Sequence, residues 1–343
     1  MKDTHAAQGL SHFVEDVRHQ LFLWQQQGLA TALVTLVNYE GSSPRPIGSQ
    51  MAVNEKGEAV GLVSGGCLET ALVEEALACI KSDSHKVVRY GKDSDYFDIQ
   101  LPCGSGVDVL VSPNPNAQWV SDLNTSYLNR TSIEWRVDLA AGEYLTHALS
   151  DAVRIEKDLR SPQLTRPEMT TSFTHFSKIY QPRTCVVVVG DGVIFDYFLA
   201  MAQLFDVELV AYSKAFNALE PEVEVDPDAI FQGPKTNLQR LPLRSPDNFD
   251  KSYLDQWSAF ITLSHEHDWE PDILSMALQT DAFYIGALGS RKTHERRKGL
   301  LKDLQVSDDQ IAKIKAPVGL NIGGRTPPDI ALSILAEIVS ARR

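Results

Sequence analysis

The chain has 343 residues, of which 43% are hydrophobic and 22% are charged, and its formal net charge is −13. Because single hydrophobic cores stop growing near about 250 residues, the length predicts two domains, and the composition excludes a chain that is disordered throughout. The excess of acidic residues disfavours nucleic acid and anionic membranes as partners. The sequence has no run of about 18 apolar residues and no signal peptide at its start, so a cytoplasmic location is expected.

The first part of the chain is predicted to form a mixed α and β domain. Residues 11–27 carry apolar side chains at helical spacing, with Ser11 as N-cap and Gly28 as the stop. A second helix is expected at 67–82. Strands are expected at 30–39, 85–90 and 106–113, and two more within 49–65 are joined by a turn at Asn54–Gly57.

Residues 114–180 show fewer periodic signals. They predict a helix at 117–128, a strand at 132–139 and an exposed loop at 161–172. We assign this segment to the first domain, which gives predicted domains of 1–180 and 181–343.

Strands and helices alternate after residue 183. A β-branched run at 184–189 ends in glycines and is followed by a helix at 194–205 and a strand at 207–212. Later segments are predicted as strands near 258–264 and 281–287 and as helices at 270–280, 291–304 and 327–342. The predicted fold class is therefore α/β: an N-terminal α+β domain followed by a C-terminal Rossmann-like domain with a mainly parallel sheet.

The turn after the first strand of this second domain contains Gly190 and Gly192, as in dinucleotide-binding turns. Phe195 stands where a third small residue is usual, and Tyr212 and Ser213 end the next strand where NAD enzymes have an acidic residue. Ordinary NAD binding is therefore disfavoured, and a tight turn without a ligand is the alternative.

Two further polar segments follow strands of the same sheet. His265, His267 and Asp268 form an incomplete metal set, so we predict hydrogen bonds to a ligand and no metal, with a solvated loop as the alternative. Gly289, Ser290, Arg291 and Thr293 open a helix and form the best anion site in the sequence, with a solvated basic helix start as the alternative. Thr326 is expected to be a helix N-cap.

The first domain offers a second group of candidates. Arg45 lies in a rigid turn, and the glycine turn of Ser64, Gly65 and Gly66 places Cys67 at a helix N-terminus, which favours the thiolate. Cys103 lies in another glycine turn. For both cysteines a structural role is the alternative, and Cys79 and Cys185 are expected to be buried small hydrophobic residues.

Together these segments resemble the XdhC/CoxI family. Gly41–Met51 and Ser64–Glu69 look like its N-terminal signature, and residues 186–343 look like its Rossmann domain, most closely at Tyr284–Thr293 and Pro317–Glu337. The resemblance implies an accessory protein that binds molybdenum cofactor (molybdopterin) transiently, aids its sulfuration with a cysteine desulfurase, and inserts it into a xanthine dehydrogenase-like molybdoenzyme. It also implies a homodimer, and it assigns no catalytic residue.

Two other functions remain open. The Rossmann-like domain alone would fit an NAD(P)-dependent oxidoreductase, and a pocket alone would fit a non-catalytic nucleotide-sensing scaffold.

Overall fold

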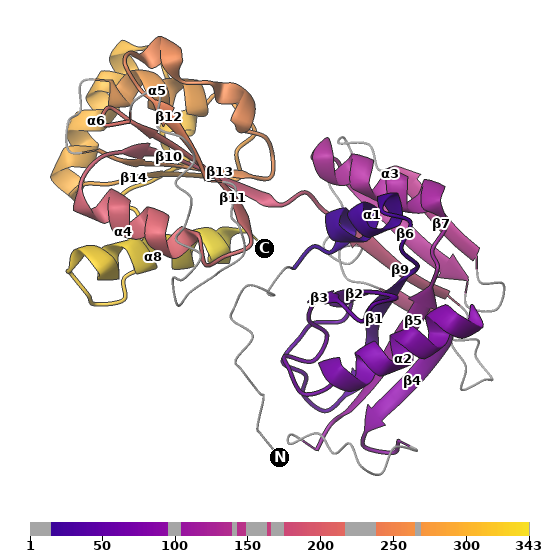
Figure 1. Ribbon diagram of the computed structural model, residues 1–343. Coiled ribbons are helices and arrows are strands. Elements are labelled where there is room, and N and C mark those ends of the chain that lie inside the picture. Colours follow the sequence, from indigo (N-terminus) through magenta and orange to yellow (C-terminus); the bar gives the residue numbers. More distant parts are fainter. Residues whose placement is uncertain are drawn as a thin grey trace. The chain divides into compact units, whose positions relative to one another are not determined.

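The computed structural model describes residues 15–94, 104–138, 143–148, 163–165, 175–216, 238–264 and 269–342. The described residues form two compact units, one ending at Pro182 and the other beginning at Arg183. The strands and helices of each unit pack with one another (Figure 1), and each unit has its own apolar cores. No helix in the described ranges has both the length and the hydropathy of a membrane span.

The first unit is built on a five-stranded antiparallel sheet with the order β3-β2-β1-β5-β4. Its strands are β1 (Thr31–Glu40), β2 (Gln50–Asn54), β3 (Ala59–Gly61), β4 (Lys86–Gly91) and β5 (Gly106–Pro113). These strands confirm the sequence prediction. The turn between β2 and β3 lies where it was expected, and Gly57 adopts the left-handed φ of 81° that favours glycine there.

Both faces of this sheet are covered. Along β1, Val34 and Leu36 face the core under helix α2 (Glu69–Ser82), whereas Leu33 and Val37 face the opposite core. The opposite core is closed by α1 (Arg18–Gln26), α3 (Ala117–Leu128) and a second sheet of order β7-β6-β9-β8. That sheet contains β6 (Ile133–Asp138), β7 (Glu143–Ala148), β8 (Gln163–Thr165) and β9 (His175–Tyr180).

Two predictions for this unit were wrong. Helix α1 begins at Arg18 and not near residue 11, because Asp16 folds back to accept hydrogen bonds from the backbone and guanidinium of Arg18, and residues 15–17 are not helical. Part of the expected loop at 161–172 is strand β8, which pairs with β9. Ser11 lies outside the described residues.

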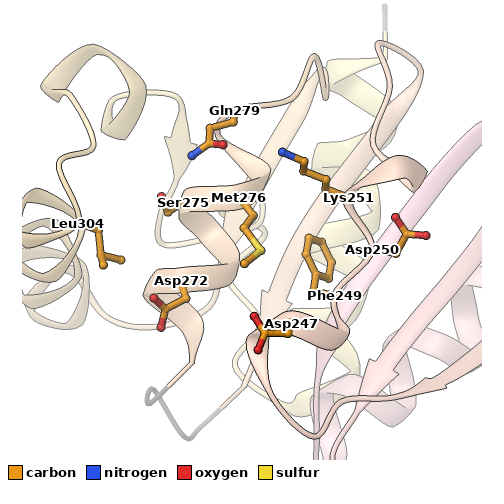
Figure 2. A pocket seen from close by; sticks show the side chains of 9 residues that line it. All are labelled: Asp247, Phe249, Asp250, Lys251, Asp272, Ser275, Met276, Gln279 and Leu304. Carbon is orange, nitrogen blue, oxygen red and sulfur yellow. The ribbon is translucent and has the colours of Figure 1, made fainter.

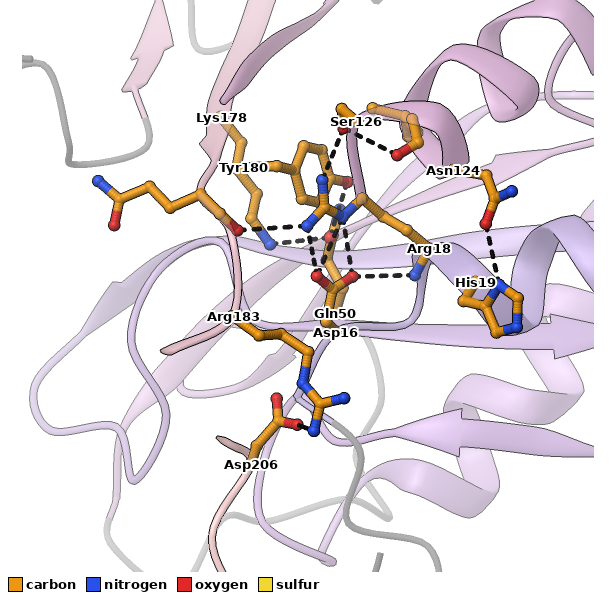
Figure 3. Close-up of polar contacts among 12 residues, drawn as sticks. Asp16, Arg18, His19, Gln50, Asn124, Ser126, Lys178, Tyr180, Arg183 and Asp206 are labelled. Carbon is orange, nitrogen blue, oxygen red and sulfur yellow. Dashed lines mark hydrogen bonds and ion pairs between the residues drawn. The ribbon is translucent and has the colours of Figure 1, made fainter. Parts of the chain in front are cut away.

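A polar network joins the two sheets of the first unit (Figure 3). The side-chain carbonyl of Gln50 on β2 accepts hydrogen bonds of 2.8 Å from the Lys178 ammonium and of 2.8 Å from the Tyr180 hydroxyl, both on β9. Lys178 also donates to the carbonyl of Gly48 at 2.8 Å. Nearby, the buried guanidinium of Arg18 pairs with Asp16 and donates to Ser126 at 2.8 Å.

The second unit has one six-stranded parallel sheet with the order β12-β11-β10-β13-β14-β15. Its strands are β10 (Thr184–Gly190), β11 (Val207–Ser213), β12 (Leu238–Pro242), β13 (Ser258–Leu263), β14 (Tyr284–Ala287) and β15 (Ile314–Lys315). Counted within the unit, this is the strand order 3-2-1-4-5-6 of dinucleotide-binding sheets, so the predicted Rossmann-like fold is confirmed.

Helices cover both faces of the parallel sheet (Figure 1). On one face α4 (Val193–Ala202) packs beside α8 (Pro327–Ala341), and on the other lie α5 (Glu270–Ala277), α6 (Arg291–Asp303) and α7 (Asp308–Ile311). The predicted N-cap at Thr326 is confirmed, since its side chain accepts a hydrogen bond from the Asp329 amide. The short elements β12, β15 and α7 were not predicted.

Candidate functional site

The carboxyl ends of β10 and β13 form the point at which the strand order reverses, where ligands of open α/β sheets bind. A narrow crevice lies there, and its volume of about 20 Å³ has room for about one water molecule. Side chains or backbone from the ends of four strands line it, including Gly190, Asp191, Lys214, Leu243, Thr262 and Glu270. At this volume the crevice is too small for an organic ligand.

The backbone geometry of the turn after β10 requires glycine at two positions. A Cβ on Gly190 would lie 2.8 Å from the carbonyl carbon of Leu263, so glycine lets β10 approach the end of β13. Gly192 adopts a φ of 87° as the residue before α4. Phe195 is 2% exposed and packs in the core beneath α4. Backbone geometry alone therefore explains these two glycines, and a bound phosphate is not needed to explain them.

Charged groups of both signs meet at the crevice. The Lys214 ammonium lies 4.4 Å from the ring centre of Trp269, and the carboxylates of Asp191 and Glu270 are its acidic lining. His265, His267 and Asp268, which were predicted here, lie outside the described residues. Ser264 and Trp269, which flank that segment in the sequence, both line the crevice.

The second candidate on this edge is the start of α6. Ser290 is its N-cap: the Oγ atom accepts from the Thr293 amide at 3.1 Å and shares a hydrogen bond of 2.9 Å with the Thr293 hydroxyl. Gly289 has a φ of 132°, and a Cβ there would lie 2.9 Å from Thr293 Cγ2. Gly289, Ser290 and Thr293 therefore fix the backbone conformation at the start of α6. Arg291 is exposed and forms no ion pair with any residue that the structure describes.

Arg291 also lines a groove of about 660 Å³ beside α6. One wall carries basic residues of α6, including Lys298 and Lys302, which pair with Glu295 and Asp308 at 2.9 and 2.8 Å. The other wall is largely apolar and is formed by Ile311, Ala312, Ile314, Ala316 and Pro317.

His294 of α6 also lines this groove. Burial and the nearby charges of Arg297 and Lys298 lower the pKa of His294 below its ordinary value, so this ring is neutral near pH 7.

A cavity of similar size, about 610 Å³, lies between α5 and the short helices at Pro246–Asn248 and Lys251–Tyr253 (Figure 2). Asp247, Asp250 and Asp272 line it with a single cation, Lys251. Three carboxylates disfavour an anionic ligand there. The described residues contain no cluster of histidine, cysteine or acidic side chains that could hold a metal ion.

The glycine turn of Ser64, Gly65 and Gly66, a candidate for cofactor binding, is occupied by a carboxylate of the same chain. The Glu69 carboxylate accepts hydrogen bonds from the amides of Ser64, Gly65 and Gly66 at 2.9, 3.3 and 2.8 Å, and from the Ser64 hydroxyl at 2.7 Å. Burial opposes ionisation, but these hydrogen bonds lower the pKa of Glu69 below its ordinary value. The glycine turn therefore encloses an internal carboxylate.

The remaining candidates of the first unit are Cys67, Arg45 and Cys103, and the first two differ in exposure and in hydrogen-bonding partners. Cys67 is exposed beside the glycine turn, two residues before α2. Arg45 forms an ion pair of 2.7 Å with Glu15. Cys103 lies outside the described residues. These residues belong to the first unit, whereas the candidates at the edge of the parallel sheet belong to the second.

Comparisons with known proteins agree with this architecture. Residues 24–91 match the XdhC and CoxI family, and residues 186–338 match the XdhC Rossmann domain. The chain is 29% identical over 318 residues, 92% of its length and 84% of the relative, to the molybdenum cofactor insertion chaperone PaoD of Escherichia coli (strain K12). It is 23% identical to a protein of Bacillus subtilis (strain 168) named as a probable xanthine dehydrogenase subunit, over 91% of this chain and 93% of that protein.

A solved structure shows the same fold. It is described as a xanthine dehydrogenase from Bacillus halodurans and is superimposed with a TM-score of 0.69 at 22% identity, covering 94% of this chain and 95% of that one. The two family matches together span more than half of the chain and include both units. The chain is therefore a member of the XdhC/CoxI family.

Proposed function

We propose that this protein is a cytoplasmic chaperone that binds molybdenum cofactor transiently and inserts it into a xanthine dehydrogenase-like molybdoenzyme. Relatives named for cofactor insertion and for xanthine dehydrogenase support an accessory role for molybdoenzymes. The observation that carries the proposal is the exposed Arg291 guanidinium at the start of α6, on the ligand-binding edge of a Rossmann sheet.

The candidate site has two parts, the groove beside α6 and the crevice at β10 and β13, and only the groove is large enough for the cofactor. Ligand pockets usually have volumes of about 300 to 1,000 Å³, a range that includes the groove beside α6 and excludes the crevice at β10 and β13. The proposal places the cofactor phosphate at Arg291, where the amides of the first helical turn add positive potential. The organic part would then lie against the apolar wall of the groove.

Thiolates bind soft metal centres, and the first unit offers one candidate independently of the groove beside α6. Cys67 is the exposed cysteine among the described residues, and its thiolate would suit a molybdenum–sulfur centre. We therefore include in the proposal that Cys67 contributes to handling of the sulfurated cofactor, with a cysteine desulfurase as sulfur donor. A homodimer of this chain completes the proposed assembly.

Copurification tests the proposal. The protein is isolated from cells that make molybdenum cofactor and from matched cells that cannot, and each sample is analysed for molybdenum and pterin. We expect both in the first sample only, and we expect that sample to activate a cofactor-free xanthine dehydrogenase-like enzyme. A protein with neither molybdenum nor pterin that also fails to activate the enzyme would refute the proposal.

A further inference from the structure

A buried ion pair between Glu270 and Arg297 lies beneath the carboxyl edge of the parallel sheet. The Glu270 and Arg297 side chains are 4% and 2% exposed. The contact is bidentate: Nε donates to one carboxylate oxygen at 3.0 Å and Nη2 donates to the other at 3.0 Å. Such a pair is rigid, because the planar guanidinium matches the carboxylate at two points.

The pair also holds two loops at the edge of the sheet. The Thr262 hydroxyl near the end of β13 donates to Glu270 at 2.7 Å. Arg297 Nη2 donates to the carbonyl of Leu288 at 2.7 Å, and Leu288 immediately precedes the Gly289 turn into α6. The Glu270–Arg297 pair therefore connects the end of β13, the first residue of α5 and the loop that opens α6.

Stability alone does not account for this arrangement. Replacement of a buried ion pair by apolar side chains of similar volume is often neutral or stabilising, because the charges must be removed from water. An apolar pair would fill the same space but could not donate to the Leu288 carbonyl. The specific consequence of the charged pair is the orientation of the loop from Leu288 to Ser290, and hence of Arg291.

We infer that Glu270 and Arg297 are positioning residues that fix the start of α6 and so orient Arg291 for binding a phosphorylated ligand. The inference rests on the proposed function, because Arg291 is the anion contact of that proposal. Neither residue lines the groove in which the proposal places the ligand. Glu270 also lines the crevice at β10 and β13, so the pair joins the two parts of the candidate site.

The test is the double variant Glu270→Met/Arg297→Met, in which no buried charge is left without its partner. We expect it to fold with a Tm close to that of the parent. Its amide hydrogen exchange at residues 289–293, measured without cofactor, should be about tenfold faster, because the loop has lost its anchor. Molybdenum and pterin retained after gel filtration should fall by roughly tenfold, as expected when residues that orient a binding group are lost.

Two further variants complete the design. Arg297→Lys keeps the charge but not the fork of donors, and its retention should lie between those of the parent and the double variant. Arg296→Met changes an exposed neighbour on the same helix and should behave as the parent. Unchanged exchange at 289–293 in the folded double variant would overturn the inference.

Arg291→Ala separates the inference from the proposed function. If Arg291→Ala lowers retention and the double variant does not, the positioning role is wrong while the proposed cofactor site stands. If Arg291→Ala leaves retention unchanged, the proposed site on α6 is wrong, and the positioning role for a ligand falls with it.

Discussion

The carboxylate of Asp191 accepts a hydrogen bond from the hydroxyl of Ser213, which joins the loop after β10 to the end of β11. This acidic side chain belongs to the loop after β10, whereas NAD enzymes take the residue that holds the ribose hydroxyls from the end of the second strand, here Ser213. One oxygen of this carboxylate is already engaged by Ser213. Its charge also stands next to Gly192 and the start of α4, where the pyrophosphate of NAD would lie.

We therefore expect weak NAD and NADP binding. Asp191 repels the pyrophosphate, and the crevice of about 20 Å³ has no room for a nicotinamide ring. Calorimetric titration should give no affinity tighter than about 1 mM. Asp191→Asn removes the charge and should strengthen whatever residual nucleotide binding exists. Micromolar affinity of the parent for NAD would contradict this expectation and favour an oxidoreductase.

Arg291→Ala is expected to weaken cofactor retention. A charge-assisted hydrogen bond to an anion contributes about 1.5 to 3 kcal/mol, so retention should fall by roughly 10- to 100-fold. Molybdenum and pterin per mole of purified protein measure the effect.

Arg296→Ala is the matched control for this prediction, because Arg296 is another exposed arginine on α6 and does not line the groove. Equal loss in both variants would show a general effect of helix charge. Parental retention in a folded Arg291→Ala protein would place the phosphate elsewhere.

Periodic segments of the fold could be predicted from the sequence, and aperiodic ones could not. The β-branched run of β10 and the apolar stripe of α8 are long and are covered by helices or sheet, so their patterns are unambiguous. Strand β15 has two residues, and β8 and β9 carry polar side chains, so they lack a pattern of their own and depend on pairing. The start of α1 was misplaced because Asp16 and Arg18 interact through side chains.

The candidate site shows the same limit. Arg291 and Ser290 could be chosen because they follow a strand and open a helix. Glu270 and Arg297 were not chosen, because their pairing across 27 residues has no sequence signature. The internal hydrogen bonds of Glu69 to the glycine turn were likewise missed, although its place three residues after Gly66 was visible. Residue type indicates a capacity for binding, and only the fold shows which groups are already engaged.

Cys67 is expected to be alkylated first among Cys67, Cys79 and Cys185. Cys67 is exposed, whereas burial and the nearby charge of Glu75 raise the pKa of the Cys79 thiol, and Cys185 is buried in β10. Treatment of the folded protein with iodoacetamide, followed by mass spectrometry, should show Cys67 reacting at least about tenfold faster. Faster reaction of Cys79 would contradict this order.

Cys67→Ser tests whether that thiol takes part in the proposed function. We expect the variant to fold normally, because the side chain is exposed, and to activate the client enzyme less well than the parent. Equal activation and equal molybdenum content would show that the exposed thiol has no part in cofactor handling. The cofactor would then be held by the edge of the parallel sheet alone.

Lys178 is expected to make the stability of the first unit depend on pH in the alkaline range. Burial lowers the pKa of Lys178 from 10.5 to about 8 in the folded protein. Between these values the unfolded chain binds a proton that the folded chain does not, so the free energy of unfolding rises with pH from about 8 to 10.5. Burial raises the pKa of Tyr180, which has the opposite effect, so stability should fall again once unfolded tyrosine ionises.

The comparison of the parent with Lys178→Met isolates this contribution, because the other groups that titrate in the same range are common to both proteins. A shift of this size corresponds to at most about 3 kcal/mol, and because Lys178 is only partly buried we expect about 2 kcal/mol. Urea unfolding of the full chain at pH 7.5, 9 and 10 should show the parent gaining stability relative to the variant as pH rises. A difference that is constant across this range would mean that Lys178 keeps its ordinary proton affinity, and that its hydrogen bonds to Gln50 and Gly48 are made by an ammonium group throughout.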